Sequence, residues 1–193
     1  MKSKRNQLIF TIVFCSIMAA LSIVLEKFLS FPKGSSYLKF TLYGLPLMVT
    51  GIFFGKLPGT LSGVVSGTIL QLTSEWGISI MSIFWALAPI AWGFFSGLLS
   101  DIFKKNLNLP KIILIVFTCS ICSFLLNTLT MIIDSSLYAD SYYTASVIIK
   151  NLPPRLISML ILLIAYSGIL FGLYKSLKKI MIFENNDEKT DDI

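Results

Sequence analysis

Residues 111–133, KIILIVFTCSICSFLLNTLTMII, form an apolar run that decides the fold class of this chain. About 20 apolar residues cross the hydrocarbon core of a bilayer as a helix. Asp134 and a polar segment follow the run, and another apolar run opens at Leu156, just after Pro153 and Pro154. This part of the sequence therefore predicts two membrane-spanning helices joined by a polar connection.

The composition extends this prediction to the whole chain. Hydrophobic residues make up 55% of the 193 residues, and the mean hydropathy is +0.80, which is typical of membrane proteins. We expect an all-α membrane protein, a compact bundle of six transmembrane helices in a single domain over residues 1–183. An acidic, disordered cytoplasmic tail is expected at 184–193. The predicted spans are Leu8–Leu29, Phe40–Phe54, Leu57–Thr73, Ile78–Phe103, Ile112–Ile133 and Leu156–Tyr174.

The basic residues predict the orientation. Six spans place both termini on the same side, and cytoplasmic loops carry an excess of Lys and Arg. With both termini cytoplasmic, five of the 16 basic residues fall outside: Lys27, Lys33, Lys39, Lys150 and Arg155. The net charge of +6 therefore reflects topology in a multi-pass protein of the cell membrane, and no nucleic-acid partner is expected.

Several classes of chemistry are excluded by what the sequence lacks. There is no histidine, which excludes a Ser-His-Asp hydrolase and an H-E-x-x-H metalloprotease. There is no P-loop, so any use of ATP would depend on a partner. Cys15, Cys119 and Cys122 lie inside apolar runs, and without histidine they predict no metal site. We expect a protein that is not an enzyme.

A polar stripe in the run of residues 111–133 and just beyond it indicates a binding pocket. Asn127, Thr130 and Asp134 are spaced by three and four residues, so on a helix they share one face. Such groups are costly against lipid, and the stripe should face protein or water. We expect a small-molecule pocket near one membrane face, closed by Asn127, Asp134, a nearby tyrosine and Arg155. Arg155 would either pair with Asp134 or hold a ligand carboxylate.

Two further side chains are candidates for the same pocket. Trp85 offers a flat wall for a ring-shaped ligand, although a membrane tryptophan also serves as core or interface belt. Gln71 follows Gly59, Gly63 and Gly67 at the same four-residue spacing, so it should face the bundle interior. The glycines themselves predict close helix packing.

Small residues in the first span form two pairs four residues apart, Cys15 with Ala19 and Ser16 with Ala20. Small residues allow helices to approach closely in a membrane. The pairs indicate either an internal contact of the bundle or a docking surface for another membrane subunit. Gly168-x-x-x-Gly172 repeats the spacing in the last span and predicts packing there.

Taken in order along the chain, these features resemble the substrate-capture (S) components of energy-coupling factor (ECF) vitamin transporters, folate-type branch. The resemblance covers most of the chain. It rests on six short spans, the block LKFTLYGLP at 38–46, the glycines at 51, 55 and 59, Asn127…Asp134…Tyr138, and Pro154-Arg155-Leu156-Ile157.

The resemblance implies a transport role. S components of this kind bind a vitamin from outside with high affinity and deliver it with a membrane-embedded coupling (T) subunit and two cytoplasmic ATPases. No cofactor is implied for the chain itself, because the partner subunits use the ATP. The family's first helix docks on the T subunit through small residues, here Cys15, Ser16, Ala19 and Ala20. Its substrate contacts correspond to Tyr37, Lys39, Trp85, Asn127, Asp134, Tyr138 and Arg155.

Folate or a related vitamin is the expected substrate, because Lys39 and Arg155 suit an anion and Trp85 suits a ring. Three alternatives stay open. The chain could be an S component for another vitamin or precursor, of the pantothenate, pyrimidine or pyridoxine type. It could be a stand-alone proton-coupled secondary transporter with Asp134 or Glu26 as proton carrier. It could also be a membrane scaffold in which the polar stripe only holds helices together.

Overall fold

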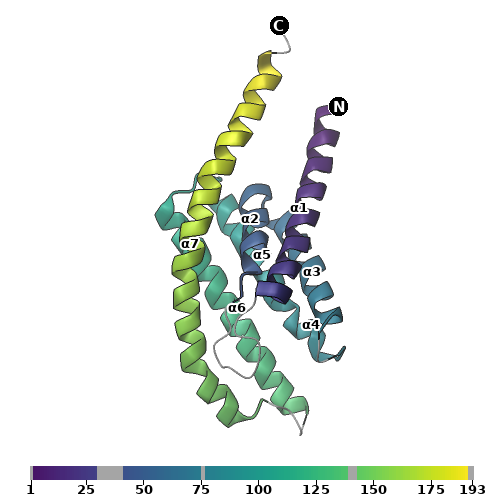
Figure 1. Ribbon diagram of the computed structural model, residues 1–193, viewed down its shortest axis with the longest axis vertical. Helices are drawn as coiled ribbons and strands as arrows, with labels where there is room; N and C mark the ends of the chain where they lie inside the picture. The colour runs from purple at the N-terminus through teal and green to yellow at the C-terminus, as the bar shows by residue number, and fades with distance from the viewer. Residues whose placement is uncertain (1, 30–40, 75–76, 139–142, 191–193) are drawn as a thin grey trace.

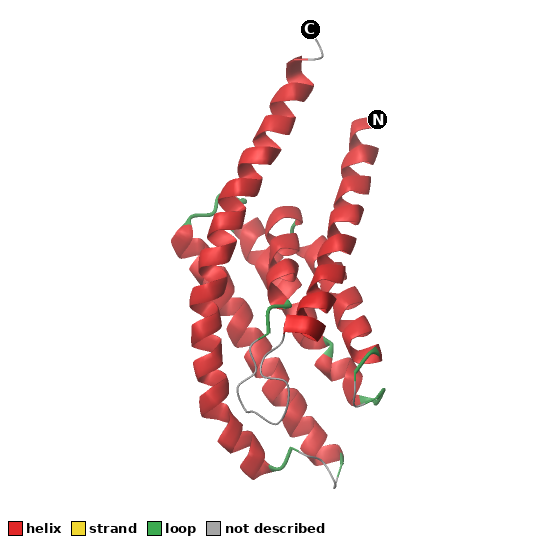
Figure 2. Cartoon of the chain, viewed as in Figure 1, coloured by secondary structure: helices red, strands yellow, loops and turns green. Residues whose placement is uncertain are grey.

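The computed structural model describes residues 2–29, 41–74, 77–138 and 143–190, with side chains described between residues 5 and 176. This part of the chain is helical and contains no strand (Figure 2). The all-α prediction is confirmed. The helices are α1 (Lys2–Leu29), α2 (Gly44–Phe54), α3 (Lys56–Leu72), α4 (Met81–Trp85), α5 (Leu87–Ile102), α6 (Leu109–Leu137) and α7 (Ala145–Thr190).

Membrane character follows from helix length and composition. In the described part of the chain, four segments are long and apolar enough to cross a bilayer: Arg5–Leu29, Met81–Ile102, Leu109–Leu137 and Ala145–Ser176. α2 is a shorter apolar helix, and α3 has 17 residues. Figure 1 shows the start of α1 and the end of α7 at the same end of the molecule. Each of the six predicted spans corresponds to helix, while a full crossing by α2 and α3 stays a prediction.

The fourth predicted span is two helices instead of one. α4 ends at Trp85 and α5 begins at Leu87, with a turn at Ala86. Pro89 explains the position, because proline has no N–H for the carbonyl four residues earlier and its ring clashes with that carbonyl. That carbonyl belongs to Trp85. The kink expected near Pro89 is therefore a break one turn before it, and it sets the orientation of the segment that carries Trp85.

The last helix begins earlier than its prolines suggested. Pro153 and Pro154 were expected in its first turn, whereas they lie inside α7, which starts at Ala145. Figure 1 shows these first turns of α7 bending away from the axis of the rest of the helix, as internal prolines require. At the other end, α7 extends to Thr190, into the segment whose composition predicted a disordered tail.

The glycine ridge of α3 packs directly on α5. A Cβ atom added to Gly59 would lie 2.4 Å from the Gly93 carbonyl oxygen, and one added to Gly63 would lie 2.7 Å from the Pro89 carbonyl oxygen. Two helices can approach this closely only where side chains are absent, which confirms the packing predicted for the ridge. The same prediction is wrong for Gly168, whose added Cβ would meet no described atom within 4 Å.

Residues 41–44 are fastened to three helices. The Ser22 hydroxyl of α1 donates to the Tyr43 carbonyl at 2.9 Å and accepts from Ser66 of α3 at 2.9 Å. The Tyr166 hydroxyl of α7 donates to the Thr41 carbonyl. Ser22 and Ser66 are fully buried, so these bonds satisfy groups that neither lipid nor water could reach. The polar interior between α1, α3 and α7 therefore fixes where the chain enters α2.

At the opposite end of the bundle, Tyr174 joins α7 to the turn between α5 and α6. Its hydroxyl donates to the Lys105 carbonyl at 2.6 Å and accepts from the Leu107 N–H at 3.3 Å. Leu107 is buried, so Tyr174→Phe leaves a buried N–H without its partner. We expect a loss of about 1–3 kcal/mol in unfolding free energy, seen as a lower thermal midpoint of the purified protein in detergent.

Thr118→Val is the control for Tyr174→Phe. Its hydroxyl donates only to the Leu114 carbonyl of its own helix, on an exposed surface. We expect a change within about 0.5 kcal/mol. Equal midpoints for the Tyr174→Phe and Thr118→Val variants would show that the Tyr174 bridge does not stabilise the bundle.

Candidate functional site

Arg155 is the centre of the candidate site. It lies on α7 with its side chain turned toward α6, where its Nη1 donates to the Met131 sulfur at 3.0 Å. Its guanidinium carbon lies 5.0 Å from the centre of the Phe124 ring. A thioether is a weak acceptor, and a ring face satisfies only part of a guanidinium. The remaining donors suit a carboxylate or carbonyl of a ligand.

An aromatic pair adjoins this arginine. The rings of Trp85 on α4 and Tyr143, just before α7, lie 5.8 Å apart with a 45° angle between their planes. Tyr143 also interacts electrostatically with Arg155. The structure therefore brings Trp85 and Arg155, which the sequence separates by 70 positions, into one cluster through Tyr143. A ring-shaped ligand would find both a flat aromatic surface and a cation there.

Asn151 belongs to the same face of α7, one turn before Arg155. The residue is 7% exposed, and its Oδ1 has no hydrogen-bond partner in the described part of the chain. A buried amide oxygen without a partner is uncommon in folded proteins and calls for an explanation. We refer to these side chains together as the arginine cluster: Trp85, Phe124, Met131, Tyr143, Asn151 and Arg155.

The polar stripe of α6 faces the bundle, as its spacing predicted. Thr130 is fully buried, and Asn127 and Asp134 are half-buried. The Thr130 hydroxyl donates to the Leu126 carbonyl of its own helix at 2.8 Å, so it is satisfied locally. The described contacts of Arg155 on α6 are with Phe124 and Met131, and its pairing with Asp134 stays a prediction. A binding role for Asn127 and Asp134 stays a prediction.

The other predicted contacts are more scattered. Gln71 is half-buried at the end of α3, where the glycine ridge stops. Tyr138 is 43% exposed at the end of α6. Tyr37 and Lys39 lie outside the described residues. Neither Gln71 nor Tyr138 has a described contact with the arginine cluster.

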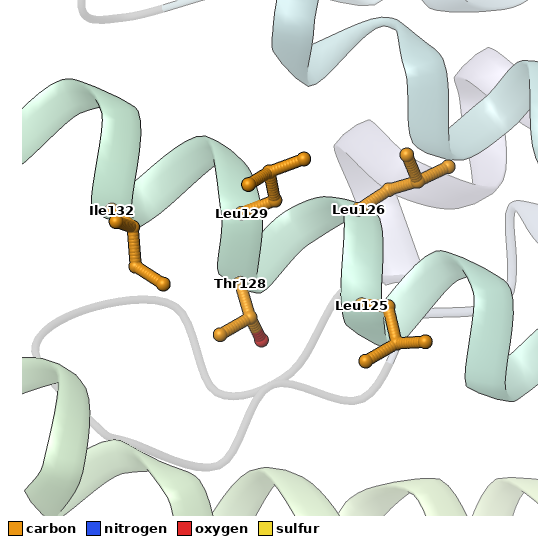
Figure 3. A pocket seen from close by; sticks show the side chains of 5 residues that line it. All are labelled: Leu125, Leu126, Thr128, Leu129 and Ile132. Carbon is orange, nitrogen blue, oxygen red and sulfur yellow. The ribbon is translucent and has the colours of Figure 1, made fainter.

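An open groove of about 360 Å3 lies along α6, and three of its five lining side chains, Leu125, Leu129 and Ile132, are exposed. Its described lining is apolar apart from Thr128, whose hydroxyl donates to the Phe124 carbonyl at 2.8 Å. Figure 3 shows Leu125, Thr128 and Ile132 on one side of α6, and Leu126 and Leu129 on the other. The described lining contains none of the predicted polar contacts and no member of the arginine cluster.

The small residues of α1 divide between two faces. Ala19 is buried, and the Cys15 carbonyl accepts from Ser62 of α3 at 3.5 Å, so this pair is an internal contact of the bundle. Ser16 and Ala20 are exposed, and the Ser16 hydroxyl donates to Ile12 of its own helix. The sequence left both roles open for both pairs, and the structure places one pair on each side.

Four members of the arginine cluster were not singled out from the sequence. Phe124 and Met131 lie on the same helical stripe as Asn127, three residues before it and four after it, but apolar residues in an apolar run carry no signal. Asn151 did carry a sequence signal, because it lies four residues before Arg155 and hence on the same helical face. That shared face is visible only if the helix begins before Asn151, whereas the prolines predicted a later start. Tyr143 was noted only as one of several nearby tyrosines.

Comparison with known proteins decides the family. The family model of the ECF-type riboflavin transporter S component matches residues 6–179. The chain belongs to this family. It is accordingly a multi-pass membrane protein and a component of a transporter. A search of curated proteins found no match for this S component.

Solved structures of other S components share the fold. ThiT from Listeria monocytogenes has a TM-score of 0.63 at 19% identity, over 90% of this chain and 98% of ThiT. FolT bound with folic acid has a TM-score of 0.59 at 19% identity, over 85% of this chain and 92% of FolT. The S component for biotin from an ECF-type ABC transporter has a TM-score of 0.55 at 18% identity, over 88% of this chain and 97% of that one. At such identities the likeness concerns the fold alone.

Proposed function

We propose that this S component captures a ring-bearing vitamin from outside the cell and delivers it together with a T subunit and two ATPases. The observation that carries the proposal is the arginine cluster, in which a half-buried guanidinium lies beside the Trp85–Tyr143 pair. Buried cations in a membrane protein are costly and are retained mainly where they serve a function. Membership of the family supports the transport role.

Folate or a related fused-ring vitamin is the proposed substrate, with riboflavin as the second candidate. The sequence resemblance supports folate, and the name of the matching family supports riboflavin. Both vitamins offer a flat ring system for the aromatic pair. Folate adds carboxylates for Arg155, whereas riboflavin offers it ring carbonyls.

We place both termini in the cytoplasm, with six crossings and the arginine cluster toward the outside. The basic residues support this orientation. The start of α1 and the end of α7 lie at the same end of the molecule in Figure 1, and the arginine cluster lies toward the other end of α7. Lys104, Lys105 and Lys111 then lie at the cytoplasmic face, where basic side chains are favoured.

The exposed face of α1 is the proposed surface for the T subunit. Ser16 and Ala20 lie on it among exposed apolar side chains such as Ile12, Ile17 and Val24. Small residues flanked by apolar ones are the pattern by which membrane helices associate closely. Cys15 and Ala19 support this face from within, through the contact with α3.

Identifying the bound molecule tests the proposed function. The full chain is purified in detergent, bound small molecules are released by denaturation, and mass spectrometry identifies them. We expect a fused-ring vitamin, and co-purification of a T subunit and ATPases from the native membrane. Proton-gradient-driven uptake by the chain alone in vesicles would support a secondary transporter instead. Absence of any ligand, together with no binding of added vitamins, would support a scaffold.

A further inference from the structure

The unpartnered oxygen of Asn151 requires a hydrogen-bond donor. Asn151 is more than nine-tenths buried on α7, and its Oδ1 is one of few buried polar atoms without a partner in the described part of the chain. Leaving a buried amide oxygen without a donor costs the full desolvation penalty of that oxygen. Such a group calls for an explanation, and a hydrogen-bond donor on a bound ligand provides one.

The local backbone adds acceptors and no donors. Pro153 and Pro154 have no N–H, so the carbonyls of Ile149 and Lys150 lack the donor that a regular helix would give them. This part of α7 therefore presents acceptor oxygens, whereas one turn further on Arg155 presents only donors. An acceptor and a cationic donor lie side by side on one helical face, because residues four apart are neighbours.

We infer that Asn151 and Arg155 together read the amide edge of a ring, with Asn151 Oδ1 accepting from a ring N–H and Arg155 donating to the adjacent ring carbonyl. The inference rests on the proposed function and specifies its substrate class as a cyclic amide or imide. Flavin and pterin rings both carry such an edge, in which N3–H adjoins the C4 carbonyl. A vitamin with a cationic ring and no ring carbonyl, such as thiamine, matches neither group and is repelled by the guanidinium.

Asn151→Leu tests the inference, because leucine keeps the approximate volume and removes the acceptor. Ligand-free protein is titrated with riboflavin, with folic acid, with thiamine, and with the N3-methyl analogues of riboflavin and folic acid, and Kd is measured by fluorescence or calorimetry. We expect Asn151→Leu to weaken binding of the preferred vitamin about 10-fold, the scale of one hydrogen bond to a buried group. Methylation of the vitamin at N3 should weaken binding to the unsubstituted protein by a similar factor. It should not raise the Kd of the Asn151→Leu variant any further.

Two variants keep the test interpretable. Asn151→Asp keeps the shape and an acceptor oxygen, so the penalty for N3-methylation should persist. Ser158→Ala is the matched control, since Ser158 is buried on the same face of α7 but donates to the Pro154 carbonyl at 2.9 Å. Its Kd should be unchanged.

The outcomes separate this inference from the proposed function. Preference for thiamine over both fused-ring vitamins, or an Asn151→Leu variant that binds the preferred vitamin as tightly as the unsubstituted protein, would overturn the inference while leaving vitamin capture intact. A protein that binds no vitamin at all would overturn both.

Discussion

Gly93→Ala should lower the thermal unfolding midpoint of the purified protein by several degrees. The added Cβ would lie 2.0 Å from the Gly59 carbonyl oxygen and 2.6 Å from the Gly59 carbonyl carbon. Both are backbone atoms, so no side chain can rotate away and α3 itself has to shift from α5. Overpacking of this kind costs about 1–3 kcal/mol, and backbone contact on both sides places Gly93 at the upper end. Differential scanning fluorimetry in detergent measures the effect.

Gly168→Ala and Gly172→Ala are the matched controls. Both positions lie inside α7, and an added Cβ at either would have no described atom within 4 Å. Alanine is favoured over glycine in a helix interior by about 1 kcal/mol, so their midpoints should stay the same or rise. If Gly93→Ala unfolds at the same temperature as these controls, α3 and α5 do not cross in backbone contact.

Arg155→Ala should weaken binding of the vitamin by about 10- to 100-fold. Losing a charge-assisted hydrogen bond costs about 1.5–3 kcal/mol, and each 1.4 kcal/mol is a factor of ten in Kd. The described partners of Arg155 are a sulfur, a ring face and the electrostatic contact with Tyr143, so truncation removes no strong internal hydrogen bond. The free energy of unfolding should therefore change less than the binding free energy. Calorimetry with the identified vitamin measures Kd.

Arg155→Lys distinguishes charge from geometry. Lysine keeps the charge but loses the planar fork, so it should recover only part of the affinity. Lys150→Ala removes an exposed cation of the same helix and should leave Kd unchanged. Unchanged binding by Arg155→Ala would remove Arg155 from the site, and with it the main support for an anion- or carbonyl-bearing ligand.

The helices could be predicted because hydropathy alone marks them. The ends and breaks of the helices could not be predicted, because a proline can either break a helix or stay inside it. Pro89 breaks the fourth span at Trp85, four residues earlier, whereas Pro153 and Pro154 stay inside α7. Glycine spacing had the same limitation. The pattern at Gly59 and at Gly168 is alike in sequence, but only Gly59 has a helix against it.

The site was predictable where the residue type is costly in a membrane. Arg155 and Trp85 could be proposed from sequence because a buried cation and a membrane tryptophan stand out. Met131 and Phe124 could not, since only the packing of α6 on α7 makes them partners of the guanidinium. The pairing of Asp134 with Arg155, expected from charge, stays a prediction.

The backbone crossing of α3 and α5 also implies unequal stiffness within the molecule. α2, α3 and α5 interlock through glycines that leave no room for sliding, whereas α7 packs chiefly on α6 through side chains that can repack. Amide hydrogens of α3 and α5 should therefore be the slowest to exchange. A vitamin that contacts both Arg155 and Trp85 would connect α7 to α4, which directly precedes α5. Binding of the vitamin should therefore reduce the motion of α7.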